Sequence, residues 1–171
     1  MWATGLRNTQ ALLWLPDGSL LGTDHGPSGM PHEGGRTGND ELNLLQPGRD
    51  YGWPNIIGRE EASGVVSPVW SWASTVAPGG LTGLLSPSGR WTGDILVSGL
   101  SGSLELLSLT ESDGRWHVTG HTNVVTQGRF GRLRSLLAAD DGTFSLTTSN
   151  RDARGQPRPG DDLLLRITLT R

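Results

Sequence analysis

Residues 11–23 read ALLWLPDGSLLGT, and this short segment contains the pattern that decides the fold. One apolar run ends at Pro16-Asp17-Gly18, and a second apolar run follows directly. Asp-Gly favours a tight turn because glycine adopts positive φ without steric cost. The segment therefore predicts a β-hairpin, with strands over 11–15 and 19–23.

The same pattern of run, turn and run recurs along the chain. Further turns are expected at 86–89, 111–114 and 140–142, and Leu163–Leu169 reads as a closing strand. Many short strands at this spacing indicate a sandwich, a barrel or a propeller. The repeated units favour a propeller, whose blades take about 40–50 residues. The 171 residues make about three to four blades, so we expect an all-β chain forming one partial propeller domain over 1–171.

Composition excludes the main alternatives to an all-β fold. The chain has 26 Gly and 10 Pro, and its longest stretch without either is Thr143–Arg154. An interior Gly costs a helix about 1 kcal/mol and a Pro about 3, so a helical bundle is excluded. No apolar run approaches the roughly 20 residues that span a bilayer. Residues 1–5 lack a basic segment and an apolar segment, so we expect no signal peptide in this chain.

Charge and residue usage narrow the chemistry further. The formal net charge is −3, which argues against bulk nucleic-acid binding. Absence of Cys rules out disulfides, thiol catalysis and Cys-ligated metals. All 14 basic residues are Arg, which excludes a Lys Schiff base and the lysine of a phosphate-binding loop.

Two segments break the hairpin pattern. Residues 25–39 are too rich in Gly and Pro for regular structure, and residues 151–162 form a second such loop. A loop of this length usually has a function or is mobile.

Oxygen-bearing residues gather near the first of these loops. Asp24-His25-Gly26-Pro27, Asp40-Glu41 and Tyr51 combine carboxylates with carbonyls in Gly- and Pro-containing turns. Such oxygens are what Ca²⁺ binds. The alternative is that Asp40 and Glu41 are solvated loop acids.

Other site chemistries fit less well. His25 and His32 do not have the spacing of a helical zinc-ligand pair, so surface histidines are the simpler interpretation. The chain has no Gly-x-Ser-x-Gly nucleophile motif, and no helix follows its glycine-rich loops as a dinucleotide site requires.

Arginines provide a second candidate site. Arg132 and Arg134 alternate in a predicted strand and would share one face. Two guanidinium groups on one face suit a ligand with several carboxylates or a phosphate. A solvent-facing pair at a sheet edge is the alternative.

Taken together, six motifs resemble the soluble sugar dehydrogenases that depend on pyrroloquinoline quinone (PQQ), the glucose/sorbosone dehydrogenase family. They occur in family order and span about residues 2–167: Gly5–Gln10, Asp24–Pro27, Asp40–Leu44, Asp50–Pro54, Ser74–Pro78 and Gly131–Arg134 with Asp141-Gly142 after it. The resemblance implies a six-bladed β-propeller with PQQ in its central cleft. Only about the last three to four blades would be present here.

The resemblance also implies roles for individual residues. It assigns PQQ contacts to two segments of the chain and to one threonine: Arg7, Asn8, Thr75, Arg132 and Arg134. It places a Ca²⁺ that holds PQQ at the carbonyls of Gly26 and Pro27. A second, structural Ca²⁺ would bind Glu41 and the carbonyl of Tyr51.

The sequence departs from the family pattern at several points. None of its four histidines occupies the motif of the family's catalytic base, so no catalytic residue is assigned. Ser101 stands near the position of a PQQ-contacting Lys. His25 replaces a Gln that some members carry, and the stretch Ser28–Asn39 is longer than the usual loop.

The resemblance thus implies an oxidoreductase that oxidises an aldose hydroxyl by hydride transfer to PQQ. We expect the chain to be a C-terminal piece of such an enzyme, inactive alone, with a sugar and an electron acceptor as partners once completed. A homodimer is possible, and the family habit is periplasmic or extracellular. The alternatives are a non-catalytic calcium-binding propeller module and a structural fragment that needs a partner half.

Overall fold

The computed structural model describes residues 1–86, 88–125, 128–139 and 141–169. Within them the chain forms eleven strands and one short 3₁₀ helix, with every strand pair antiparallel. The all-β prediction is confirmed. Pro87 and Asp140, which belong to two of the predicted turns, lie outside the described residues.

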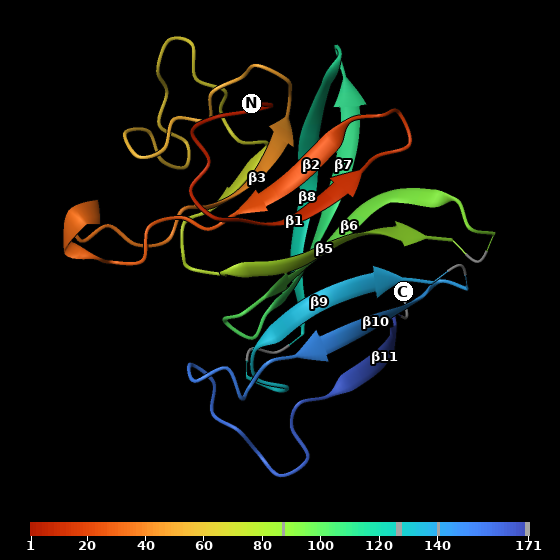
Figure 1. The fold of residues 1–171 in the computed structure, drawn as a ribbon. Coiled ribbons are helices and arrows are strands. Elements are labelled where there is room, and N and C mark those ends of the chain that lie inside the picture. The colour runs from red at the N-terminus through yellow and green to blue at the C-terminus, as the bar shows by residue number, and fades with distance from the viewer. Residues whose placement is uncertain (87, 126–127, 140, 170–171) are drawn as a thin grey trace. The chain divides into compact units, whose positions relative to one another are not determined.

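The contacts divide the chain into two compact units, residues 1–77 and 78–171 (Figure 1). Each unit is described below by itself. The prediction of one domain over 1–171 remains a prediction.

The first unit has one four-stranded sheet. Its strands are β1 (Thr9–Trp14), β2 (Leu20–Asp24), β3 (Asp40–Leu45) and β4 (Trp70–Trp72), in that order across the sheet. The 3₁₀ helix η1 (Pro31–Glu33) lies in the loop between β2 and β3. Leu20, Leu45 and Tyr51 form a small core against the loop that follows β3.

The quoted hairpin forms as predicted. The N–H of Leu15 donates to the carbonyl of Ser19 at 2.8 Å, and the Asp17 carboxylate accepts the N–H of Ser19 at 2.9 Å. Gly18 has a φ of 86°, a conformation that favours glycine. The turn chemistry therefore fixes the register of β1 and β2.

The second unit has two sheets. One contains β5 (Pro78–Leu85), β6 (Trp91–Gly99), β7 (Leu104–Ser112) and β8 (Arg115–Val125) in sequence order. The other contains β9 (Leu133–Ala138), β10 (Thr143–Thr148) and β11 (Leu164–Thr168), with β10 in the middle.

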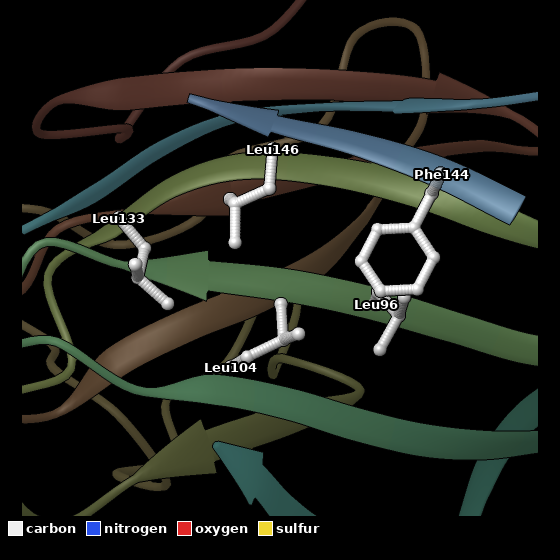
Figure 2. Close-up of a cluster of buried hydrophobic side chains, with 5 residues drawn as sticks. All are labelled: Leu96, Leu104, Leu133, Phe144 and Leu146. Carbon is white, nitrogen blue, oxygen red and sulfur yellow. The ribbon is translucent and has the colours of Figure 1, made fainter. Parts of the chain in front are cut away.

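The core of the second unit lies between its two sheets (Figure 2). Leu96 and Leu104 from the larger sheet meet Leu133, Phe144 and Leu146 from the smaller one, and all five are 0% exposed. Strand β5 approaches β9 closely because Gly80 has no side chain. A Cβ there would lie 2.7 Å from the carbonyl oxygen of Arg134.

Candidate functional site

A small cavity in the first unit is lined by all of the predicted metal ligands. The volume open to the centre of a water molecule is about 10 Å³, which is about the space that one water needs. Its lining combines carboxylates, glycine-rich backbone and aromatic rings: Gly5, Arg7, Asp24, His25, Gly26, Pro27, Glu41, Tyr51, Trp53, Ile56 and Ile57. All four residues predicted to bind Ca²⁺ (Gly26, Pro27, Glu41 and Tyr51) therefore line one cavity.

Asp24 ends strand β2 at this cavity and is 4% exposed. Its carboxylate accepts the backbone N–H of Arg7 at 2.8 Å and that of Asn8 at 2.7 Å. Burial raises the pKa of Asp24, and these two hydrogen bonds only partly oppose the shift. Asp24 thus fixes the segment that carries two predicted cofactor contacts, a role that the sequence analysis did not assign to it.

Glu41 lies directly opposite Asp24 in the pairing of β2 with β3. Its Oε1 accepts the N–H of Gly58 at 2.7 Å, and its Oε2 accepts an N–H of the Asn43 amide at 3.0 Å. Burial raises the pKa of Glu41, and the negative charges of Asp24 and Asp40 raise it further. An ionised Glu41 is therefore costly unless positive charge is near.

Asp40 is 2% exposed, so the alternative of a solvated loop acid is wrong for this residue. One carboxylate oxygen accepts the N–H of Gly26 at 2.8 Å. The other accepts the N–H groups of Val76 and Ala77, both at 2.7 Å. The two backbone segments next to Pro27 and Thr75 are therefore held by one side chain.

Gly26 is required by close packing. A Cβ at this position would lie 2.0 Å from the carbonyl oxygen of Gly38 and 2.6 Å from that of Asn39. The backbone of residues 25–27 consequently lies against residues 38–39 in a way that no other residue type allows.

Tyr51 contributes to the cavity and to the core at once. Its hydroxyl donates to the carbonyl of Leu44 at 2.6 Å and accepts the N–H of Gln46 at 2.8 Å, while its own N–H donates to the carbonyl of Thr4 at 3.0 Å. Burial raises the pKa of the phenol.

The donor set fits a hard cation. Asp24 and Glu41, two carboxylates with raised pKa values, line the cavity together with Gly26, Pro27 and Tyr51, whose carbonyls are the predicted ligands. The described part of the chain contains no group of three or more His, Cys, Asp or Glu arranged to hold a metal. Backbone carbonyls would therefore have to complete any ligand set.

Arg7 is the most enclosed of the predicted cofactor contacts. Its Nε and Nη2 contact the Oε1 of Glu33 at 2.8 and 2.7 Å, and its guanidinium lies 5.2 Å from the centre of the Trp53 ring. The sequence alone assigned no role to Glu33. No local spacing signals a pair whose members are 26 residues apart.

Asn8 and Thr75 lie at more open positions in the same unit. The Asn8 amide accepts from Gln10 at 2.7 Å and lies 3.3 Å from the Nδ1 of His25. Thr75 is exposed and precedes the two N–H groups that Asp40 binds.

Arg132 and Arg134 belong to the second unit. Arg132 directly precedes β9 and Arg134 lies within it, on either side of the buried Leu133. The N–H of Arg132 donates to the Asn150 side chain at 2.8 Å, after a turn at Gly131 with a φ of 73°. The Nε of Arg132 donates to Asp152 at 3.0 Å, whereas Arg134 is exposed.

Comparison with known proteins identifies the family. The family model described as glucose/sorbosone dehydrogenase matches residues 1–166. The chain therefore belongs to the glucose/sorbosone dehydrogenase family, whose soluble members depend on PQQ, and the predicted resemblance is confirmed.

Two solved structures are similar over nearly the whole chain. A putative oxidoreductase (glucose dehydrogenase) of Thermus thermophilus is 40% identical, with a TM-score of 0.83 over 97% of this chain and 46% of that chain. The PQQ-bound aldose sugar dehydrogenase of Streptomyces coelicolor is 29% identical, with a TM-score of 0.78 over 97% and 44%. The predicted fold class, part of a β-propeller, is confirmed.

Among curated proteins, quinoprotein glucose dehydrogenase B of Acinetobacter calcoaceticus is 38% identical over 64 residues, which are 37% of this chain and 12% of that protein. Aldose sugar dehydrogenase YliI of Escherichia coli is 31% identical over 94 residues, which are 47% and 23%. The chain spans about half the length of the solved relatives and matches a smaller share of the curated ones.

Proposed function

We propose that this chain supplies the cofactor-holding part of a PQQ-dependent sugar dehydrogenase, which oxidises an aldose hydroxyl with hydride transfer to PQQ. The match of the family model over residues 1–166 carries the proposal. It is supported by the cavity, which is lined by all four residues predicted to bind Ca²⁺.

Within this proposal, Gly26 and Pro27 offer carbonyls to the Ca²⁺ that holds PQQ, and Glu41 and Tyr51 bind a second, structural Ca²⁺. Asp24 and Asp40 hold the backbone of these segments in place through the hydrogen bonds described above. Bound Ca²⁺ would offset the burial and the charge repulsion that raise the pKa of Glu41.

PQQ would be held by Arg7, Asn8, Thr75, Arg132 and Arg134. When bound, PQQ supplies the hydride acceptor, and the arginines supply donors for its anionic groups. Arg7 and Arg132 already have carboxylate partners, so their side chains are oriented before any ligand arrives. Arg134 is exposed and has more freedom to move toward a ligand.

The base that takes the hydroxyl proton is not assigned to any of the four histidines. We therefore propose that the chain binds the cofactor but does not turn over sugar until further blades complete it. The completed enzyme would act on a sugar and pass electrons to an acceptor, outside the cytoplasm, in the periplasm or beyond. In the described residues no helix is long and apolar enough to cross a membrane.

The experiment adds Ca²⁺ and PQQ to the purified chain and follows quinone absorbance and dye reduction with glucose. We expect PQQ to bind only with Ca²⁺ present, and no dye reduction. Turnover of glucose would contradict the proposed inactivity, whereas absence of PQQ binding would contradict the arginine assignments. Calcium binding without PQQ binding would favour the non-catalytic calcium module.

A further inference from the structure

We propose that Glu33 is a positioning residue that orients Arg7 toward the ligand. The inference rests on the proposed function for the ligand itself, but its structural part concerns two side chains of this chain alone. Loop 25–39 would thereby have a defined task.

Glu33 is anchored by the loop that carries it. Its Oε2 accepts the N–H of Ser28 at 2.8 Å and that of Met30 at 3.2 Å. The backbone turns at Gly34, where φ is 66° and the N–H donates to the carbonyl of Pro31. The carboxylate is therefore held from one side by its own loop, and its side chain is 1% exposed.

The other carboxylate oxygen is committed to Arg7. Oε1 binds both Nε and Nη2, so one edge of the planar guanidinium faces Glu33. The Ser28 hydroxyl accepts a further N–H from Nη2, and the Trp53 ring lies 5.2 Å from the guanidinium carbon. Three different groups thus fix the plane and the direction of the guanidinium.

The remaining nitrogen is the least committed. Nη1 contacts the carbonyl of His25 at 3.5 Å, longer than the contacts of Nε and Nη2. The Arg7 side chain keeps 18% exposure and lines the cavity described above. Glu33 therefore leaves the Nη1 edge of Arg7 as the edge available to a ligand, in a fixed direction.

Loop 25–39 is also tied to the segment beneath Arg7. Arg36 donates from Nε to the carbonyl of Glu33 at 3.3 Å and from Nη2 to the carbonyl of Pro54 at 3.2 Å. Since Trp53 precedes Pro54, the loop holds both the carboxylate and the ring that enclose Arg7. An arginine side chain without such contacts loses more conformational freedom on binding a ligand than one whose guanidinium is already held in place.

The first test needs no cofactor. The Arg7 Nε–H resonance, assigned with the Arg7→Lys variant, is followed by NMR for solvent exchange and mobility. We expect it to be protected and rigid in the wild type, and exposed and mobile in Glu33→Ala. A resonance that stays protected in Glu33→Ala overturns the inference.

Matched variants separate orientation from loop folding. Glu60→Ala removes another loop carboxylate, which accepts the N–H of Ile57 at 2.9 Å, and should leave the Arg7 resonance unchanged. Exchange of the Ser28 and Met30 amides reports on the loop itself. Glu33→Gln keeps the size of the side chain and removes its charge, and it should release the Arg7 resonance with less loss of amide protection than Glu33→Ala.

The second test measures PQQ affinity with Ca²⁺ saturating. Glu33→Ala should weaken binding about tenfold, the lower end of the loss found when a group that orients a metal-binding side chain is removed. In an Arg7→Ala background the same change should have no further effect. Additive losses, or unchanged or tighter binding in Glu33→Ala, would overturn the inference. If the wild type binds no PQQ, the proposed function fails while the resonance of Arg7 still decides the structural part.

Discussion

Residues 1–77 and 78–171 differ in how far they rely on apolar packing and on buried carboxylates. In the second unit, long hairpins pack around five side chains that are fully buried, and all of them are apolar (Figure 2). In the first unit, the loops are held by the carboxylates of Asp24, Glu33 and Asp40, each 2–4% exposed. Each of these carboxylates accepts backbone N–H groups from segments outside the strands.

This difference shows which features a unit needs in order to bind a cation. An apolar core fixes a sheet but provides no charged group at a defined place. Buried carboxylates fix irregular backbone, and burial raises the pKa of Asp24 and Glu41; for Glu41 the negative charges of Asp24 and Asp40 raise it further. The less regular unit is thus the one suited to hold a cation. The following predictions, from the largest expected effect to the smallest, test this contrast.

Removing the largest apolar side chain of the second core should have the largest effect. Phe144→Ala leaves a cavity between the two sheets, so the free energy of unfolding should fall by about 3–5 kcal/mol. The measurement is denaturant unfolding. Leu137→Ala in the same sheet, at a side chain 70% exposed, is the matched control and should change stability by about 0.5 kcal/mol or less. Equal losses in both variants would contradict an apolar core as the basis of this unit.

Calcium should stabilise the first unit through Glu41. At about 100 times its dissociation constant, a bound ion adds about 2.7 kcal/mol to the free energy of unfolding. Glu41→Gln should lose this increment, whereas Glu111→Gln at an exposed position should keep it.

The raised pKa of Glu41 also predicts how the free energy of unfolding changes with pH. A carboxyl with a raised pKa stabilises the fold below its ordinary value of 4.5, and this contribution is lost as the pH rises through the folded value. Without calcium, wild-type stability relative to Glu41→Gln should therefore decline as the pH rises through and above 4.5. A difference that grows with pH would show that Glu41 is stabilised as an anion by the protein alone.

Filling the close contact at Gly26 should have a smaller but clear effect. Gly26→Ala places a Cβ against the backbone of residues 38–39, so we expect a loss of about 1–3 kcal/mol in thermal or denaturant unfolding. Gly120→Ala, whose Cβ would meet Ser108 at an ordinary 3.4 Å, serves as the control. Similar stability in both variants would mean that residues 25–27 do not need this close approach.

The smallest expected effect is the loss of stability when Glu33 is protonated at low pH. Burial opposes ionisation of Glu33, but the N–H of Ser28 and the Arg7 guanidinium outweigh it and lower its pKa to about 2. The stability that this carboxylate provides is present above its ordinary pKa of 4.5 and is lost as the pH falls toward 2. A carboxyl titration by NMR should show the Glu33 midpoint near 2, with faster amide exchange in 28–30 below it. A midpoint near 4.5 would contradict the ion pair.

The hairpins could be predicted because their information is local. Asp17-Gly18 and Asp113-Gly114 mark turns within a few residues of the runs they connect, and both hairpins form. The pairing of Asp24 with Glu41 was not predicted, although it follows once the register of β2 and β3 is known.

The remainder of the site depends on contacts between distant residues. Asp40 binds N–H groups 36 and 37 residues away, and Glu33 binds Arg7 26 residues away. Neither contact leaves a periodic signal in the sequence. The bond from the N–H of Arg132 to the Asn150 side chain, 18 residues away, is likewise not visible in the sequence pattern.

Tyr51 is the chain's single tyrosine, and its hydroxyl lies between Leu44 and Gln46 in the first unit. In an alkaline titration, the absorbance of the tyrosine phenolate therefore comes from one known side chain. The phenol ionises at a higher pH while its hydroxyl remains buried, and at a lower pH once the loop after β3 has opened. The protein thus contains its own optical reporter for residues 1–77, to which residues 78–171 contribute no signal.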